Sequence, residues 1–368
     1  MRIQAAVTRA PAAPMSLEMV DLAEPRDDEI LVRLVATGVC HTDSAMRDQA
    51  FPVPQPIVLG HEGAGVVVKA GRFASGVSPG DHVVMSYNSC GHCPSCRDDE
   101  AGYCHDFFGY NFAGLRPDGT SPISNVGEVI HGNFFGQSSF ASYALCRPRN
   151  VVVVRKDAPL HLLGPLACGV QTGAGAVINA LKVGVGDSLA VFGAGSVGLS
   201  AVLAAKVVGA TTVVAVDLNT ERLALARELG ATHTFDGADP DLVARVVGAT
   251  GGGAAFSFDT TGAPAVIRKA VDSLALRGEC GTVGAAPLGT EVTLDLMGLM
   301  TGGRRFRGIV EGDATPQVFI PVLIELFMQG RFPFDKLVTF YPFDRINDAL
   351  HDSEAGKVVK PVLRMPVT

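Results

Sequence analysis

The pattern of apolar and polar residues changes character near residue 170. Up to that point, short apolar runs such as 30–35 and 64–68 are separated by glycine, proline, asparagine and aspartate. Short apolar runs between turn residues are typical of β-strands. The first part of the chain therefore predicts a mostly β unit with long loops.

After about residue 171 the pattern alternates between strand-like and helical segments. The strand-like runs are 189–192, 213–216, 232–235, 255–259 and 280–283. Such alternation predicts an α/β fold with a doubly wound parallel sheet. Within it, Gly230 is expected to end one helix, and Asp239 before Pro240 is expected to be the N-cap of the next.

The last part of the chain is expected to return to the first unit. It contains a helical pattern at 318–328 and a final strand at 358–363. The predicted organisation is a first domain of residues 1–170 and 311–368, interrupted by a second domain of residues 171–310. A chain of 368 residues is long enough for two cores.

Composition narrows the class of partner. The net charge is −7 and no basic block accumulates, which argues against nucleic acid or an anionic membrane as partner. We expect a small-molecule ligand instead. Residues 1–9 lack the apolar core of a secretory signal, so a cytoplasmic location is expected. The uncharged stretch 188–205 contains three glycines in six residues, and it predicts a strand, a loop and a helix rather than a membrane span.

Four of the eight cysteines lie within fifteen residues, at Cys90, Cys93, Cys96 and Cys104. Four thiolates at such spacing can close around one structural zinc ion. The competing interpretation is an iron–sulfur cluster, but the spacing differs from the ferredoxin runs. We expect the metal to brace the lobe 90–104, which has little core of its own. Cys146 and Cys280 are expected to be buried apolar residues.

A second set of metal-binding side chains is dispersed along the sequence. Cys40, His61 and Cys168 lie far apart, and each alone could be an ordinary core residue. Together, three ligands would leave a fourth coordination position open, as a catalytic zinc requires. A zinc ion there would lower the pKa of a bound alcohol.

A glycine-rich loop indicates dinucleotide binding. Gly193, Gly195 and Gly198 form a G-x-G-x-x-G run that follows a predicted strand and precedes a predicted helix, and Asp217 comes nineteen residues later. In this context the loop is expected to hold a pyrophosphate, and Asp217 to accept a hydrogen bond from the adenosine ribose. That carboxylate would repel a 2′-phosphate, which favours NAD over NADP.

With these motifs, the chain resembles the zinc-dependent medium-chain alcohol dehydrogenase family over nearly its whole length. The segments 86–93, 134–140 and 311–313 are similar to its aryl-alcohol branch, which oxidises benzyl alcohol. Bacterial dehydrogenases of allylic terpene alcohols such as geraniol look similar too. The resemblance implies a GroES-like catalytic domain joined to a Rossmann domain, with Cys40, His61 and Cys168 as ligands of the catalytic zinc.

The resemblance also implies roles around that zinc. Glu62 would stabilise the metal or bind it transiently, and Asp43 would accept the second N–H of His61. Thr42 would begin proton export through the nicotinamide ribose, although it could also cap the helix that follows. Many relatives end this relay with a histidine three positions later, where this chain has Ala45.

Three basic residues match positions that relatives place on the cofactor. His41 and Lys360 are expected on the pyrophosphate. Arg222 is expected on the adenosine ribose, although it could equally be a solvated helix charge.

Phenylalanines gather after the cysteine lobe and suggest an apolar slot for a flat or conjugated substrate. Core packing is expected to account for about half of them. The set comprises Phe107, Phe108, Phe112, Phe134, Phe135 and Phe140, with Phe51 and Tyr87 as further candidates.

The prediction is an NAD-dependent enzyme with two zinc ions per chain that oxidises primary aryl alcohols to aldehydes, reversibly. A geraniol-type alcohol is the alternative substrate. A zinc-free quinone reductase or a non-enzymatic relative is disfavoured by the ligand set. We expect a homo-oligomer, either a dimer or a tetramer.

Overall fold

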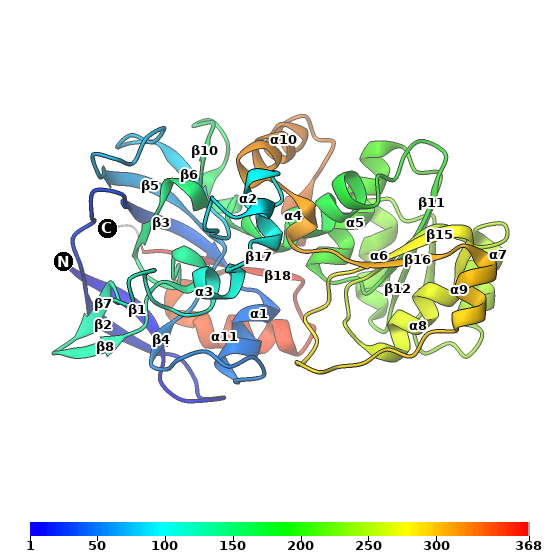
Figure 1. Cartoon of the computed structure of the whole chain (residues 1–368), viewed down its shortest axis with the longest axis horizontal. Coiled ribbons are helices and arrows are strands. Elements are labelled where there is room, and N and C mark those ends of the chain that lie inside the picture. The colour runs from blue at the N-terminus through cyan, green and yellow to red at the C-terminus, as the bar shows by residue number, and fades with distance from the viewer. Residues whose placement is uncertain (367–368) are drawn as a thin grey trace. The chain divides into compact units, whose positions relative to one another are not determined.

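The chain folds into two units in the computed structural model, which describes residues 1–366 (Figure 1). The first unit comprises Met1–Cys168, Thr315–Met328 and the chain from Val338 on. The second comprises Gly169–Ala314 and Gln329–Leu337. The sequence placed the boundaries after residues 170 and 310 and did not foresee that 329–337 packs with the second unit.

Two sheets, mostly antiparallel, build the first unit. The five-stranded sheet has the order β4 (Ile57–Val58), β1 (Arg2–Thr8), β2 (Ser16–Leu22), β7 (Ile123–Asn125), β8 (Glu128–Ile130). The seven-stranded sheet has the order β10 (Val151–Val154), β6 (His82–Met85), β5 (Gly63–Ala70), β3 (Ile30–Gly38), β18 (Lys360–Arg364), β17 (Val338–Pro342), with β9 (Tyr143–Cys146) also paired to β3. The helices are α1 (His41–Arg47), α2 (Pro94–Arg97), α3 (Phe107–Asn111), α10 (Pro316–Met328) and α11 (Ile346–Glu354).

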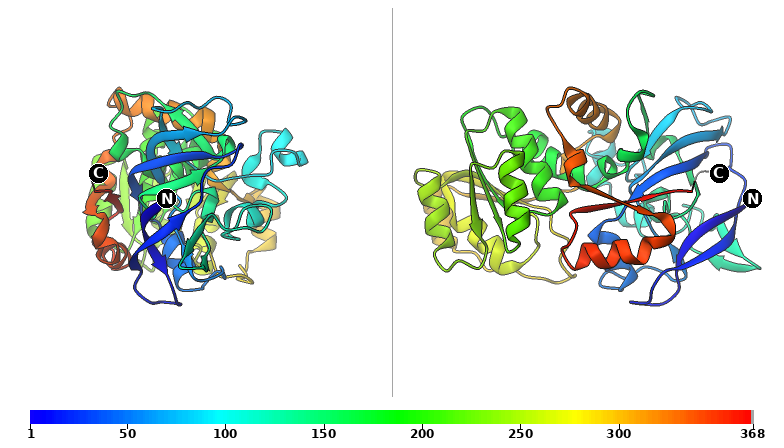
Figure 2. Two further views of the ribbon diagram at one scale, coloured as in Figure 1. Left: turned by 90° about the vertical axis from the view of Figure 1, so that its left-hand side faces the viewer. Right: turned by 180° about the vertical axis from the view of Figure 1, so that it is seen from behind.

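Strand β3 joins distant parts of the first unit. Its first half pairs with β9 and its second half with β18, where Gly38 lies opposite Val362. Figure 2 shows the red strand β18 beside the blue strands of the N-terminal region. Because β3 leads directly into α1, this pairing brings the start of β18 close to the N-terminus of that helix.

A six-stranded parallel sheet forms the centre of the second unit. Its order is β13 (His233–Asp236), β12 (Thr212–Asp217), β11 (Ser188–Phe192), β14 (Ala254–Asp259), β15 (Leu274–Thr282), β16 (Arg305–Gly308). The helices are α4 (Gly169–Gly175), α5 (Ser196–Val208), α6 (Thr220–Leu229), α7 (Leu242–Ala249), α8 (Pro264–Asp272) and α9 (Leu296–Gly302). Counted within the unit, the strand order is 3-2-1-4-5-6, that of a Rossmann sheet. The predicted fold class is confirmed.

One predicted helix boundary is wrong. Gly230 ends α6 as expected, but α7 begins at Leu242 rather than after Asp239. The Asp239 carboxylate accepts a hydrogen bond from the N–H of Asp241 and contacts Arg245. It therefore stabilises a turn before the helix instead of capping the helix itself.

The two cysteines outside the metal clusters lie in the cores. Cys146 is 1% exposed in the first unit and Cys280 is 0% exposed in the second. Burial raises the pKa of Cys280 to about 12, so this thiol stays protonated and packs as an apolar group.

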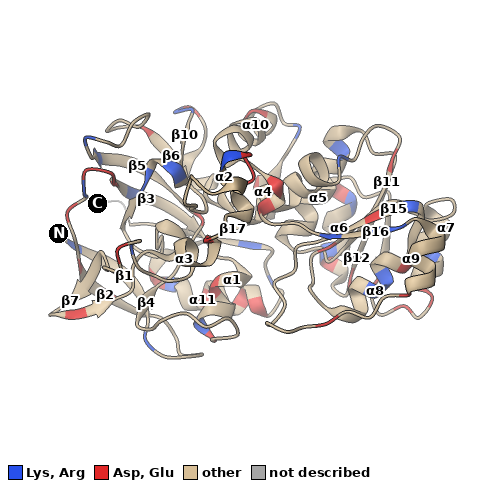
Figure 3. Ribbon diagram, in the orientation of Figure 1, with Lys and Arg blue, Asp and Glu red and all other residues tan. Residues whose placement is uncertain are grey.

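Charges of both signs are interspersed along the ribbons (Figure 3). The uncharged stretch 188–205 forms β11, the glycine loop and most of α5. Within residues 1–366, no helix has the length and hydropathy needed to cross a membrane.

Candidate active site

The cysteine lobe brings four sulfurs together within one short segment. The Sγ atoms of Cys90, Cys93, Cys96 and Cys104 all lie within 4.8 Å of one another, and none is in a disulfide. Zn–S bonds of about 2.3 Å in a tetrahedron place the sulfurs about 3.8 Å apart. The Cys90–Cys96 separation is 3.9 Å, so the lobe fits a structural zinc ion.

The thiols of this lobe have opposite tendencies to ionise. Hydrogen bonds from the backbone amides of His105 and Cys96 lower the pKa of Cys93 to about 6, whereas burial raises the pKa of Cys104 to about 12. A cation is needed to hold all four sulfurs as thiolates.

The second cluster is assembled from three distant segments of the first unit. Cys40 is the N-cap residue of α1, His61 and Glu62 immediately precede β5, and Cys168 follows the short 3₁₀ helix Gly164–Ala167. One ligand atom from each of the four lies within 4.8 Å of the others. The fold thus brings together the three predicted ligands and Glu62.

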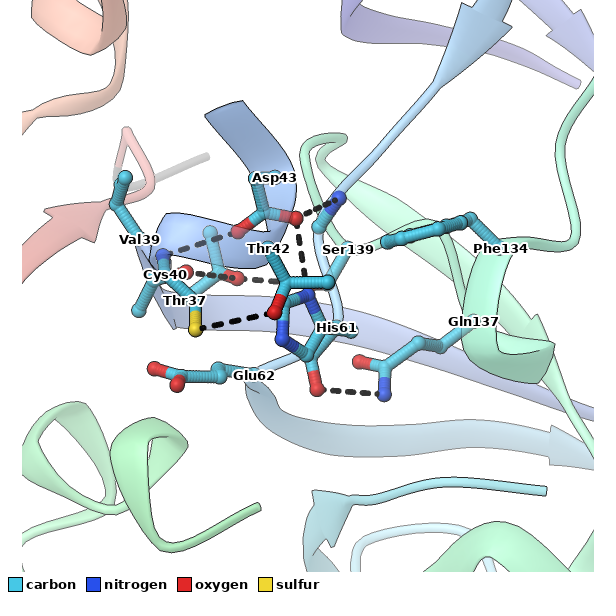
Figure 4. Close-up of polar contacts among 12 residues, drawn as sticks. Thr37, Val39, Cys40, Thr42, Asp43, His61, Glu62, Phe134, Gln137 and Ser139 are labelled. Atoms are coloured by element: carbon cyan, nitrogen blue, oxygen red, sulfur yellow. Dashed lines mark hydrogen bonds and ion pairs between the residues drawn. The ribbon is translucent and has the colours of Figure 1, made fainter. Parts of the chain in front are cut away.

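Asp43 is the residue that fixes His61. Its Oδ1 lies 2.9 Å from His61 Nδ1 and also accepts a hydrogen bond from Gly60 N, while Oδ2 accepts from Cys40 N (Figure 4). With Nδ1 donating to the carboxylate, Nε2 of His61 is left as the free acceptor. That atom is buried and has no hydrogen-bond partner, which suits a metal ligand.

Burial and neighbouring groups have opposing effects on the pKa values of Cys40 and His61. A hydrogen bond from Cys168 is the main cause that lowers the pKa of Cys40 well below the ordinary range of a thiol, against the effect of burial. Burial disfavours the charged form of His61, but Asp43 and Cys40 together outweigh it and raise the pKa of His61. Two thiols and one imidazole nitrogen are a donor set that zinc prefers, so these residues fit the ion.

Lys360 lies beside the catalytic cluster. Its side chain is buried, and its Nζ lies 2.8 and 3.0 Å from the two carboxylate oxygens of Glu62. Nζ also donates to Val39 O at 3.2 Å. The ammonium therefore neutralises Glu62 inside the metal cluster, and Glu62 in turn raises the pKa of Lys360 despite its burial. The expected contact of Lys360 with the cofactor pyrophosphate stays a prediction.

Glu62 fits only because Gly38 has no side chain. A Cβ at Gly38 would lie 1.9 Å from Glu62 Oε2. This close approach explains a glycine at the end of β3, where a side chain would displace the carboxylate.

The remaining predicted residues of α1 lie at its N-terminus. Cys40 occupies the N-cap position and the Asp43 carboxylate accepts its N–H, so Thr42 does not cap the helix. The Thr42 hydroxyl lies 3.7 Å from Cys40 Sγ. Thr42 as a residue is half-buried, and His41 is exposed. Ala45 lies one turn further along the helix.

In the second unit the glycine loop links β11 to α5. A Cβ at Gly198 would meet Gly193 O at 1.8 Å, so the helix packs on the loop only with glycine there. A Cβ at Gly195 would meet nothing within 4 Å. The loop is tight on one side and open on the other, which fits the approach of a pyrophosphate to the backbone.

Asp217 closes the same loop at the end of β12. Its carboxylate accepts hydrogen bonds from Ala194 N at 2.6 Å and Asn219 N at 2.8 Å. Asn219 caps α6, and Arg222 lies in the first turn of that helix, with a buried Nε that has no hydrogen-bond partner. The two residues predicted to bind the ribose thus lie at the same edge of the sheet.

The phenylalanines sort into core and partly exposed members. Phe134 and Phe140 are fully buried, whereas Phe108 is 59% exposed and stacks on Phe51 with ring centroids 5.7 Å apart. The Phe135 ring stacks on the imidazole of His61 at 4.6 Å. Ring contacts run continuously from the partly exposed pair to His61, through Phe112 and Phe135. Phe107 joins this chain, and Tyr87 packs against Phe107.

Sequence reasoning missed two buried polar residues beside the catalytic cluster, Gln137 and Ser86. Both contact the backbone of ligand segments. The signal was available in the run Phe134–Phe140, where three polar residues lie among phenylalanines and must find partners if buried.

Comparisons with known proteins agree with this geometry. Residues 26–156 match the family model described as alcohol dehydrogenase GroES-like domain, and residues 196–328 match that described as zinc-binding dehydrogenase. The chain is 49% identical to geraniol dehydrogenase of Castellaniella defragrans, over 98% of this chain and 97% of the relative. It superposes with a TM-score of 0.97 on benzyl alcohol dehydrogenase from Acinetobacter calcoaceticus, with 47% identity and 100% of both chains covered. An alcohol dehydrogenase zinc-binding domain protein from Burkholderia ambifaria gives a TM-score of 0.98 and 54% identity, also with 100% of both chains covered.

Proposed function

The chain belongs to the zinc-dependent medium-chain alcohol dehydrogenase family, and from that membership we propose that it oxidises primary alcohols bearing an aromatic ring to aldehydes, with NAD as hydride acceptor. The observation that carries this proposal is the chain of ring contacts that runs from the accessible Phe51 and Phe108 to the ring of His61. Zinc and NAD are the cofactors.

The proposed roles of the metal-site residues follow from their positions. Cys40, His61 and Cys168 would hold the catalytic zinc, which when bound supplies the positive charge that lowers the pKa of an alcohol. Asp43 orients the imidazole of His61 so that Nε2 faces the other ligand atoms. The Lys360–Glu62 pair keeps a second carboxylate beside the site without adding net charge.

Proton removal is assigned to Thr42. Its hydroxyl lies 3.7 Å from Cys40 Sγ on a half-buried residue, so it is in place to accept the alcohol proton and pass it on. Ala45 cannot take part, and water would be the terminal acceptor.

The aromatic rings near His61 support a ring-bearing substrate. Phe51 and Phe108 offer accessible faces, and Phe112 and the buried Phe135 continue the ring contacts to His61. Flat rings pack well on such rings by offset or edge-to-face contacts. The likeness to a benzyl alcohol dehydrogenase supports the same class.

A geraniol-type allylic alcohol is the second candidate. It is favoured by the 49% identity to a geraniol dehydrogenase, and an unsaturated apolar chain could pack against the same rings. Steady-state kinetics with NAD on benzyl alcohol, cinnamyl alcohol, geraniol and ethanol separates the candidates. We expect ring-bearing alcohols to exceed ethanol in kcat/KM by a factor corresponding to about 1–3 kcal/mol. A geraniol value well above that of benzyl alcohol would replace the first proposal by the second, and equal values of kcat/KM for all four alcohols would refute both.

The preference for NAD over NADP is assigned to Asp217. Its carboxylate lies at the end of β12, held by Ala194 N and Asn219 N, where an added 2′-phosphate would meet a negative charge. Asp217→Ala should narrow the ratio of kcat/KM for NAD over NADP by about tenfold or more, the scale of one hydrogen bond to a charged group. An unchanged ratio would place the ribose elsewhere.

A further inference from the structure

The segment Phe134–Phe140 is folded around the His61 segment. Phe135 stacks on the imidazole, Ser139 N donates to Gly60 O, and Phe140 N donates to Leu59 O. Phe135 and Ser138 both have a φ of 51°, a conformation that costs free energy for residues other than glycine. A strained backbone beside a metal ligand needs compensation from its surroundings.

Gln137 lies between these two residues, and its side chain contacts four backbone groups of neighbouring segments. Its Oε1 accepts a hydrogen bond from Gly63 N at 3.1 Å, and its Nε2 donates to His61 O at 2.9 Å (Figure 4). Nε2 also donates to Met85 O at 2.9 Å and lies 3.3 Å from Ser86 O. The side chain is 1% exposed. The carboxamide thus holds the backbone on both sides of Glu62 and ties it to the end of β6.

The same network reaches the third ligand segment. Ser86 is fully buried, and its Oγ donates to Ala167 O at 2.6 Å, one residue before Cys168. The first ligand segment is tied in as well, because Gly38 N donates to Glu62 O at 3.0 Å. Gln137 and Ser86 therefore connect the backbones that carry His61 and Cys168, without reaching the ligand atoms.

We propose that Gln137 and Ser86 are positioning residues for the catalytic zinc, which set the separation between His61 and Cys168 before the metal binds. Preset ligands lose less freedom when they close on the ion, so the network should raise zinc affinity more than it raises the stability of the fold. This inference rests on the proposed ligand set and is independent of the substrate.

The test compares Gln137→Met with Asn150→Leu. Both parent residues are carboxamides at 1% exposure with four backbone hydrogen-bond partners, and both contact Ser86 O. The other partners of Asn150 are Arg147 N, Phe135 O and Gly136 O, none of which belongs to a ligand segment. The pair therefore matches the general cost of losing a buried amide and differs in the direct hydrogen bonds to the backbone of His61 and Gly63, which Gln137 makes and Asn150 does not.

The measurement is competition for zinc between the purified holoprotein and a chelator, together with the thermal midpoint of unfolding, Tm. The catalytic zinc is identified as the ion that is absent from Cys168→Ala. Its affinity should fall about 10–100-fold in Gln137→Met. Asn150→Leu should lower Tm by as much as Gln137→Met does but leave the zinc affinity unchanged. Ser86→Ala, which removes only the hydroxyl, should weaken the same site about tenfold and covers the case in which Gln137→Met does not fold.

Three results have distinct meanings. An affinity loss in Asn150→Leu as large as in Gln137→Met would overturn the proposal, because it would show a general effect of packing. Parent-like zinc affinity in Ser86→Ala would overturn it too. A parent protein that binds one zinc ion instead of two would refute the ligand set itself, and with it this inference.

Discussion

The two metal clusters of the first unit are built in opposite ways. The cysteine lobe takes all four sulfurs from residues 90–104, and its only helical elements within that range are α2 and one 3₁₀ turn. The catalytic cluster takes its residues from three segments spread over residues 40–168, which are fixed by sheet pairing, by Asp43 and by the Lys360–Glu62 pair. In the lobe, metal binding is expected to order the segment, whereas in the catalytic cluster the fold places the ligands before a metal binds.

The largest difference should appear when one lobe cysteine is removed. In Cys93→Ala we expect loss of one zinc ion and aggregation or a much lower Tm, because zinc binding in small structural sites contributes about 10 kcal/mol or more to folding. Elemental analysis and calorimetry measure both effects. Cys146→Ala, which removes a buried thiol outside the clusters, is the control and should keep two zinc ions per chain. A Cys93→Ala protein with the Tm of the parent would contradict the view that zinc binding folds the lobe.

Removal of a catalytic ligand should give the reverse pattern. Cys168→Ala should lose one zinc ion and about 10³-fold or more in kcat/KM, equivalent to about 4 kcal/mol, while its circular dichroism spectrum stays that of the parent. The fold is expected to persist because sheet pairing, not the metal, positions the other ligands. Full activity with a single remaining zinc ion would contradict the assignment of Cys168.

A smaller effect tests the electrostatics of the catalytic cluster. Lys360→Met leaves the Glu62 carboxylate buried without its counter-ion and should destabilise the first unit by about 3 kcal/mol. The loss should be greater after zinc is removed, because the ion also neutralises the carboxylate. Thermal unfolding with and without zinc measures this, and the double variant Lys360→Met with Glu62→Gln should recover most of the loss. The absence of recovery would show that Lys360 acts through packing alone.

Features set by neighbours in sequence could be predicted, and the Rossmann unit and the cysteine lobe are examples. The alternation of strands and helices was sufficient to predict the parallel sheet, and the spacing from Cys90 to Cys104 was sufficient to predict four converging sulfurs. Both depend on local periodicity or on short loops. The start of α7 was missed because a turn closed by Asp239 competes with a helix cap.

Features set by long-range pairing could not be predicted from the residues alone. Lys360 meets Glu62 across 298 positions, through the pairing of β18 with β3. Gln137 reaches His61 across 76 positions, and no motif identifies a carboxamide as a support for a metal ligand. The dispersed zinc ligands were found only through their resemblance to a family. The homo-oligomeric state and the cytoplasmic location stay predictions.

The position of β18 also bears on how the protein is made. A ribosome synthesises Cys40, His61, Glu62 and Cys168 well before Lys360 emerges, so a nascent chain contains the ligands without the counter-ion of Glu62. Strand β3, which leads into the Cys40 segment, also lacks its pairing with β18 until then. We therefore expect the catalytic cluster to reach its final geometry only after almost the whole chain has been synthesised.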